Sequence, residues 1–209
     1  MSRVDWVLDR SKYLSQKEVR RLLKIARHLA ETGLLYSHRT PVQDYFIIHL
    51  ALETGLRVME ISQLNCGDIR VDERTGSLIV RKGKGGRKRL VRFNSEFRQH
   101  YEEYLKWKQA GNEPVESGDP LLWSSHTGGH MTSRALEKAF KRVAAKAGLP
   151  EYYSIHSLRH TFACELYKAS GYNLRLVQKQ LGHSNSRTTE VYADVMDPDV
   201  AKSLEKLYT

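Results

Sequence analysis

Hydrophobic positions recur at helical spacing through most of the chain. The first predicted helix begins at Ser15, where the run Ser-Gln-Lys-Glu forms a capping box, and it continues to about Glu31. Apolar residues follow the cap at intervals of three and four: Val19, Leu22, Leu23, Ala26 and Leu29. A second helix starts at Thr40 and is expected to end at Gly55, because glycine readily adopts the left-handed conformation of a helix cap.

The same spacing predicts further helices between Gly-, Pro- and Asn-rich breaks. A short one starts at about Val58, and the others cover about 95–110, 133–147, 156–169, 174–181 and 197–207, with a turn or short helix around Tyr192. Asp197 and Pro198 provide the cap and first position of the last helix, which carries an apolar stripe of Val200, Leu204 and Leu207. Such a stripe can cover the chain's own core or dock in trans on a neighbouring protomer.

Alternating residues in one central stretch predict strands instead. Residues 69–71, 77–80 and 90–93 are joined by turn sequences at 72–76 and 83–86, which is typical of an antiparallel meander. No repeat or linker divides the chain. The predicted fold class is therefore α+β, mainly helical with a small three-stranded antiparallel sheet. It forms one domain over 1–209, with residues 1–12 as an N-terminal extension and 197–209 as a C-terminal helix.

Composition favours an anionic partner. The chain has 34 Lys and Arg against 24 Asp and Glu, a formal charge of +10, although ribosomal proteins and many enzymes are also basic. Cys66 and Cys164 match no metal-ligand spacing and follow no secretory signal, which favours buried thiols in a reducing, cytoplasmic compartment. No apolar run approaches the roughly 20 residues of a membrane-spanning helix.

Arg57 lies in the run Thr-Gly-Leu-Arg-Val-Met-Glu, just after the glycine that ends a helix. A guanidinium fixed on such a turn suits a phosphate. The plainer alternative is a surface arginine, or an ion-pair partner for Glu60 three residues later. Arg57 alone therefore does not decide between these functions.

Seven of the twelve residues from Arg81 to Arg92 are basic: Arg81, Lys82, Lys84, Arg87, Lys88, Arg89 and Arg92. Three glycines lie among them at the predicted hairpin turn. A cationic hairpin tip can enter a DNA groove or contact a phosphate backbone. The alternative is an ordinary solvated turn.

Two histidine motifs follow. His156-Ser-Leu-Arg159 places an imidazole and a guanidinium on one helix face, where they could bind a phosphate and transfer a proton. Leu-Gly-His183 ends a later helix, and Tyr192 follows that histidine by nine residues. Taken singly, a buried structural histidine or a core tyrosine among the chain's 11 explains each of them equally well.

Together, and in this order, these motifs resemble the tyrosine recombinase or phage integrase family. The resemblance extends from about Tyr13 to Val195. It implies a helical catalytic domain that cleaves and rejoins DNA through a 3′-phosphotyrosyl intermediate, without metal or cofactor. Double-stranded DNA is then the partner, and the resemblance implies a homotetramer on DNA, a monomer when free, and action at the nucleoid.

The resemblance also implies a role for each matching residue. Tyr192 is the nucleophile, while Arg57 and Arg159 hold the non-bridging phosphate oxygens. The remaining roles are His156 for proton transfer, His183 for a hydrogen bond to the phosphate, Lys84 as the general acid and Glu60 as a supporting acid. Lys82 and Lys88 compete with Lys84 for the acid role, and Gly83-Lys84-Gly85 fits the family pattern. The expected DNA-binding residues are Arg81, Lys82, Arg87, Lys88 and Arg89.

The chain departs from the family in one respect. Members commonly carry an additional N-terminal helical core-binding domain, whereas only about a dozen residues precede the matching region here. Two other functions stay open at the level of sequence: relaxation of DNA in the manner of a type IB topoisomerase, and non-catalytic DNA binding by a regulator with the same fold.

Overall fold

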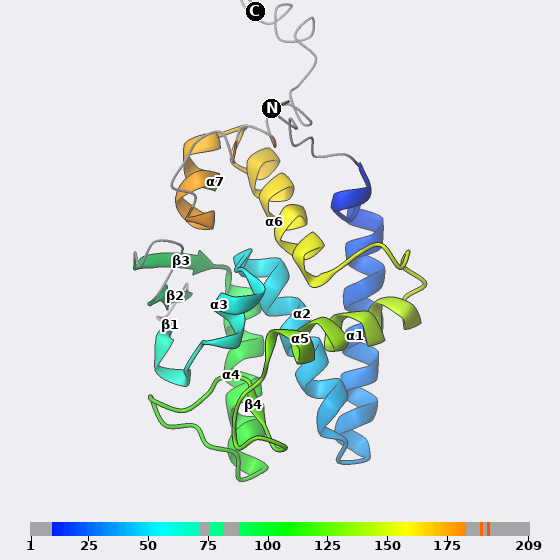
Figure 1. Ribbon diagram of the computed structural model, residues 1–209, viewed down its shortest axis with the longest axis vertical. Helices are drawn as coiled ribbons and strands as arrows, with labels where there is room; N and C mark the ends of the chain where they lie inside the picture. Colours follow the sequence, from blue (N-terminus) through cyan, green and yellow to red (C-terminus); the bar gives the residue numbers. More distant parts are fainter. Residues whose placement is uncertain (1–9, 72–75, 82–87, 183–188, 190–191, 193–209) are drawn as a thin grey trace, which may run out of the picture.

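A computed structural model describes residues 10–71, 76–81 and 88–182, together with Thr189 and Tyr192 (Figure 1). Its α-helices are α1 (Gln16–Leu35), α2 (Arg39–Thr54), α3 (Val58–Ser62), α4 (Ser95–Ala110), α5 (Ser133–Lys146), α6 (Ile155–Ala169) and α7 (Leu174–Leu181). Its strands are β1 (Ile69–Val71), β2 (Gly76–Val80), β3 (Arg89–Phe93), β4 (Trp123–Ser124) and β5 (Gly129–His130), and short 3-10 helices lie at Arg10–Lys12 and Cys66–Asp68. The predicted fold class, mainly helical with a small antiparallel sheet, is confirmed.

Helix α2 is the centre of the fold. It contacts α1, α4, α5 and α6, and α1 lies alongside it over most of its length (Figure 1). Because apolar residues surround this helix on nearly every side, it is buried rather than amphipathic: Val42, Phe46, Ile47, Ile48, Leu50, Ala51 and Leu52 are all buried. The ring of Phe46 stacks on Tyr104 of α4 with centroids 3.8 Å apart, which joins α4 to this core.

The predicted start of α1 is confirmed. The Ser15 side chain accepts from the Glu18 backbone while the Glu18 carboxylate accepts from the Ser15 backbone at 2.7 Å. The predicted end at about Glu31 was too early, since the helix continues to Leu35. Gly33 is buried inside the last turn against the beginning of α2, so it continues the helix instead of ending it.

The three central strands form a sheet in the order β1-β2-β3, as predicted, with Leu78 of β2 opposite both Ile69 and Val91. Alternate residues of the sheet point into the core. In β3 this inward face carries Val91 and Phe93, which are buried, whereas Leu90 is exposed. Helix α7 packs against β3 and so connects the sheet to the C-terminal helices.

The paired strands β4 and β5 were not predicted. Each is only two residues long, with Trp123 opposite His130, and such short segments carry no alternation for a sequence pattern to reveal. The predicted last helix, from 197, lies outside the described residues. No helix in the described ranges is both long and apolar enough to cross a membrane.

Candidate active site

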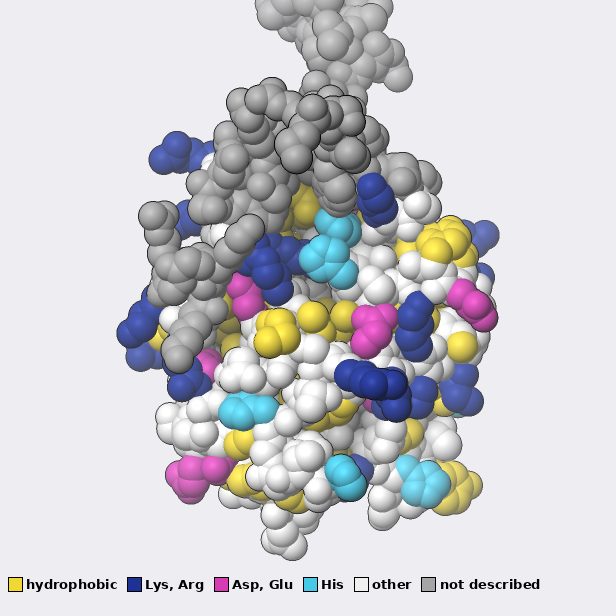
Figure 2. Space-filling model, viewed as in Figure 1, with side chains coloured by type: hydrophobic (Ala, Val, Ile, Leu, Met, Phe, Trp, Pro, Cys, Tyr) yellow, Lys and Arg dark blue, Asp and Glu magenta, His cyan; other side chains and the backbone are white. Residues whose placement is uncertain are grey.

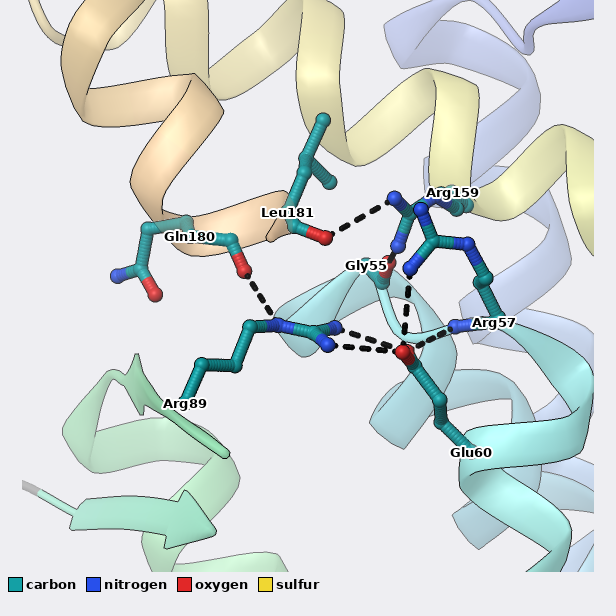
Figure 3. A network of polar contacts seen from close by, with 7 residues as sticks. All are labelled: Gly55, Arg57, Glu60, Arg89, Arg159, Gln180 and Leu181. Carbon is teal, nitrogen blue, oxygen red and sulfur yellow. Dashed lines mark hydrogen bonds and ion pairs between the residues drawn. The ribbon is translucent and has the colours of Figure 1, made fainter. Parts of the chain in front are cut away.

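Arg159 of α6 lies where the carboxyl ends of α2 and α7 meet. Its guanidinium donates to the carbonyl oxygens of Gly55 and, at 3.1 Å, Leu181 (Figure 3). The last carbonyls of a helix lack partners within the helix and carry partial negative charge, so a cation is stabilised there. The residue is 3% exposed, and burial together with the charge of Arg57 lowers the pKa of Arg159 to about 10. It remains a fixed positive charge at neutral pH.

Both helices reach this point through a left-handed glycine. Gly55 has φ +58° and Gly182 has φ +67°, a conformation that other residues adopt at a cost. A Cβ on Gly55 would lie 2.2 Å from Phe162, and one on Gly182 would lie 2.5 Å from the Arg89 side chain. Both positions therefore need glycine for backbone conformation and for space, and both border the Arg159 site.

Glu60 joins two further arginines to the site. Its carboxylate accepts from both terminal nitrogens of Arg89, at 2.7 and 2.8 Å, and from Arg57 Nη1 at 3.1 Å (Figure 3). It also accepts from the Arg57 backbone at 2.9 Å, which caps α3. Arg89 reaches the carbonyl of Gln180 as well, at 3.3 Å. One carboxylate thus fixes two guanidinium groups beside Arg159.

The charge state of Glu60 follows from these contacts. Burial alone would raise the pKa of Glu60, but hydrogen bonds from Arg89 and the Arg57 backbone outweigh it and hold the pKa below its usual value. Glu60 is therefore ionised at neutral pH. It neutralises part of the charge of Arg57 and Arg89. The Arg57 side chain nevertheless remains 28% exposed and can still bind an anion.

Helix α6 also brings two histidines towards Tyr192. The hydroxyl of Tyr192 lies 3.0 Å from Nδ1 of His160. The ring of His160 meets that of His156 at 90°, with centroids 4.6 Å apart, because the two residues are one helical turn apart. Tyr192 is 2% exposed. The predicted nucleophile is therefore buried in this structure. Its hydroxyl is hydrogen-bonded to His160, a residue that the sequence analysis did not single out.

Burial determines the protonation of this group. It lowers the pKa of His156, with the charges of Arg159 and Arg57 adding to the effect. It lowers the pKa of His160 to about 3, assisted by His156 and Arg159. Burial raises the pKa of Tyr192 to about 12, although Arg159 opposes that change. At neutral pH the His160 imidazole is neutral and Tyr192 is a phenol.

The structure thus gathers five of the residues singled out from sequence: Arg57, Glu60, His156, Arg159 and Tyr192. Two predicted catalytic residues, Lys84 and His183, lie outside the described residues, as do the predicted DNA contacts Lys82 and Arg87.

The described members of the predicted DNA-binding set differ from one another. Lys88 is exposed. Arg81 is about half exposed and makes two hydrogen bonds of 2.6 Å to Asp68. Arg89, in contrast, is only 12% exposed and is bound to Glu60, so its guanidinium belongs to the site's internal network.

His160 was missed, and Arg89 was predicted as a DNA contact and not as part of the internal network, although the sequence held a signal for each. Arg89 shares its strand face with Val91 and Phe93, both buried, so alternation in β3 points it inward. His160 follows His156 by four residues and therefore shares its helix face. Neither signal predicts the hydrogen-bond partner of the side chain, which is Glu60 for Arg89 and Tyr192 for His160.

The arrangement is suited to binding a phosphodiester. Figure 2 shows Lys and Arg side chains next to histidines on one face of the molecule. Fixed guanidinium groups can stabilise charge that develops on phosphoryl oxygens, and they need no rearrangement during the reaction. Within the described residues, no group of three or more His, Cys, Asp or Glu side chains could hold a metal ion.

Comparison with known proteins gives one family. Residues 12–198 match the model of the phage integrase family. Tyrosine recombinase XerD of Bradyrhizobium diazoefficiens is 32% identical over 204 residues, 94% of this chain and 63% of the relative. Tyrosine recombinase XerD of Oceanobacillus iheyensis is 30% identical over 182 residues, 87% of this chain and 57% of the relative. The chain thus spans less than two thirds of the length of these curated relatives.

Solved structures share the fold. The XerH site-specific recombinase, in a pre-cleavage complex with its difH substrate, superposes with a TM-score of 0.74 at 24% identity, covering 95% of this chain and 55% of that one. The XerA recombinase superposes with a TM-score of 0.71 at 24% identity, covering 98% of this chain and 64% of that one. At this identity the likeness supports the fold.

Proposed function

The chain belongs to the phage integrase family, and from that premise we propose that it is the catalytic part of a site-specific DNA recombinase. It cleaves a DNA strand through Tyr192 and rejoins it from a 3′-phosphotyrosyl intermediate. The observation that carries the proposal is that Arg57, Arg159 and the paired rings of His156 and His160, from elements far apart in the sequence, lie near Tyr192.

The proposed roles follow from the charges of the site. Arg159 is a buried, fixed cation, and Arg57 is partly exposed and oriented by Glu60, so together they suit the two non-bridging oxygens of a phosphodiester. Phosphoryl transfer places further charge on those oxygens, and preorganised cations stabilise it. His183 is assigned a hydrogen bond to the same phosphate by its match to the family motif.

Bond making and bond breaking balance within this set. The Tyr192 oxygen attacks phosphorus as its proton passes to His156, and the bond from phosphorus to the 5′ oxygen breaks. Lys84 protonates that oxygen, because a deoxyribose alkoxide is a poor leaving group. The phosphotyrosyl ester keeps the energy of the broken bond, so a 5′ hydroxyl can attack it and reseal the strand without an external energy source.

Double-stranded DNA is the partner that this proposal requires. The Tn1549 transposon integrase, which has the same fold, was solved in complex with circular intermediate DNA, and the basic excess of this chain favours a polyanion. We further propose a homotetramer on DNA, a monomer when free, and action at the nucleoid. The C-terminal helix predicted from 197 is the segment proposed to dock on a neighbouring protomer.

Trapping of the covalent intermediate tests the function. The purified chain is incubated with a library of random-sequence duplexes, each nicked so that cleavage releases a short strand and blocks resealing. Denaturing gels should show a protein–DNA adduct, and peptide mapping should place the DNA on Tyr192. Tyr192→Phe should bind DNA and form no adduct, and the wild type should form adducts in excess EDTA, since arginines supply the positive charge.

The alternatives give different results in the same assay. DNA binding without an adduct, under every condition and with every duplex, would identify a regulator and contradict the proposed reaction. Relaxation of supercoiled plasmid without exchange of strands between duplexes would identify the type IB topoisomerase activity. An adduct on any tyrosine other than Tyr192 would refute the site.

A further inference from the structure

The Tyr192 hydroxyl has a partner that the proposed reaction does not use. We propose that His160 is a positioning residue that holds Tyr192 inside the protein in the DNA-free state, so that the nucleophile must leave His160 before it can attack a phosphate. The inference rests on the proposed function, in which Tyr192 is the nucleophile. It adds a residue that controls when that nucleophile is available.

Packing shows why Tyr192 must move. Its side chain lies in a cluster of buried apolar residues from α6 and α7: Ala163, Cys164, Tyr167, Val177 and Leu181. With 2% of its surface exposed, it offers no room for the phosphorus atom of a DNA backbone to approach its hydroxyl. Attack therefore requires Tyr192 to leave this cluster and break its hydrogen bond with His160.

The hydrogen bond can form in either tautomer of His160. When Nδ1 carries no proton, the phenol donates to it; when Nδ1 is protonated, it donates to the phenol oxygen. In both cases the bond keeps the hydroxyl at His160. Proton transfer does not release Tyr192 either. Burial raises the pKa of Tyr192 and lowers that of His160, so the proton remains on the phenol. His160 thus holds Tyr192 and does not activate it.

This hydrogen bond also lies next to the phosphate site. His160 follows Arg159 directly, and its ring packs edge to face on His156. A phosphate bound by Arg159 and His156 would therefore lie beside the residue that holds Tyr192. This placement allows DNA binding to be coupled to the release of the nucleophile through one helix turn.

Nitration of tyrosines measures the holding directly and needs no DNA. The free chain is treated with tetranitromethane, which reacts with accessible phenols, and mass spectrometry gives the rate at each tyrosine. Tyr152, 63% exposed, is the fast reference. Tyr153 is the slow reference, because it is 2% exposed and its hydroxyl donates to the carbonyl of Tyr13. Slow nitration of Tyr153 also shows that the fold is intact.

The substitutions separate the hydrogen bond from the shape of the ring. His160→Phe keeps a ring against His156 but cannot bond the hydroxyl, and it should speed nitration of Tyr192 by about fivefold, the factor that one net hydrogen bond represents. His160→Asn places an amide near the position of Nδ1, so Tyr192 should stay protected. Tyr153 should stay protected throughout.

Two results would overturn the proposal. The first is wild-type nitration of Tyr192 as fast as that of Tyr152. The second is equal protection of Tyr192 in wild type and His160→Phe while Tyr153 stays protected.

If His160→Phe exposes Tyr153 as well, nitrogen NMR of the histidine-labelled wild type and Tyr192→Phe decides. The His160 Nδ1 resonance should shift when the hydroxyl is removed, and an unchanged resonance would refute the hydrogen bond. Since neither measurement uses DNA, covalent adducts without protection of Tyr192 would leave the proposed function intact and remove only this inference.

Discussion

Replacing Glu60 by glutamine tests whether one buried carboxylate organises the arginines of the site. Glu60 is only 5% exposed and accepts from both Arg57 and Arg89. Glutamine has nearly the same shape but no charge, and its amide nitrogen cannot accept. The substitution therefore leaves the Arg89 guanidinium, 12% exposed, without its counter-ion.

The loss of stability expected for Glu60→Gln follows from how deeply Glu60 and its two arginine partners are buried. Removing one partner of a buried ion pair typically costs about 3–5 kcal/mol. Glutamine keeps one acceptor oxygen, and Arg57, 28% exposed, can be hydrated, so the cost should lie at the lower end, at about 3 kcal/mol. A second substitution, Arg89→Met, removes the unpaired charge, so the double variant should be more stable than the sum of the single effects by about 2 kcal/mol.

Urea denaturation measures these differences. With a slope of about 3 kcal/mol per molar urea for a chain of this size, Glu60→Gln should unfold at about 1 M less urea. Glu31→Gln, the same change at an exposed position, should unfold within about 0.5 kcal/mol of the wild type. A destabilisation below about 1 kcal/mol for Glu60→Gln, or additive effects of the two substitutions, would refute the reasoning.

The stability difference between the wild type and Glu60→Gln should also depend on pH. Because the pKa of folded Glu60 lies below its ordinary value of 4.5, its stabilising contribution is present above that pH and is lost as the pH falls through the folded pKa. The stability difference between wild type and Glu60→Gln should therefore be constant near neutral pH and shrink on acidification below about 4.5. A difference that grows on acidification would contradict an ionised Glu60.

Three further predictions concern DNA. Lys84→Ala should cleave ordinary DNA about 10² to 10⁴ times more slowly, and should regain much of its rate in single-turnover assays when sulfur replaces the bridging 5′ oxygen, because a thiolate leaves without a proton. Arg57→Ala should not be rescued by the sulfur substrate. If that substrate rescues none of Lys84→Ala, Lys82→Ala and Lys88→Ala, the general acid lies elsewhere. Replacing Arg87 and Lys88 with alanine should make the log-log salt dependence of DNA affinity shallower by up to about 0.9 for each phosphate that is no longer neutralised, and an unchanged slope would remove the hairpin from the interface. Truncation after Asp197 should leave a folded monomer that still cleaves but does not assemble on DNA, as judged by light scattering, whereas gross unfolding would show that the last helix covers its own core.

The helices and strands were predictable because their signals are local. The capping box at Ser15 and the left-handed Gly55 each act within one helical turn, so the residues themselves carry the information. The central sheet was found from alternation and turn residues over a few positions. The two-residue strands β4 and β5 were missed because their pairing depends on the surrounding fold and not on a pattern of their own.

The candidate site was predictable as a set of residues, and its internal hydrogen bonds were not. Spacing placed His156 and Arg159 on one helix face, and resemblance added Arg57 and Tyr192. Which side chain meets which is decided by packing between distant segments: Arg89 of β3 reaches Glu60 of α3, 29 residues earlier in the chain.

The state of the proposed nucleophile was likewise decided by tertiary structure. Sequence identifies Tyr192 by its distance from a motif, but its burial against α6 and α7 and its hydrogen bond to His160 exist only once those helices pack. Burial also sets the protonation of both residues, because desolvation penalises a charged form by an amount that depends on the whole surroundings. The sequence alone thus determined which groups could carry the chemistry, and the packed structure decided how they are held and charged.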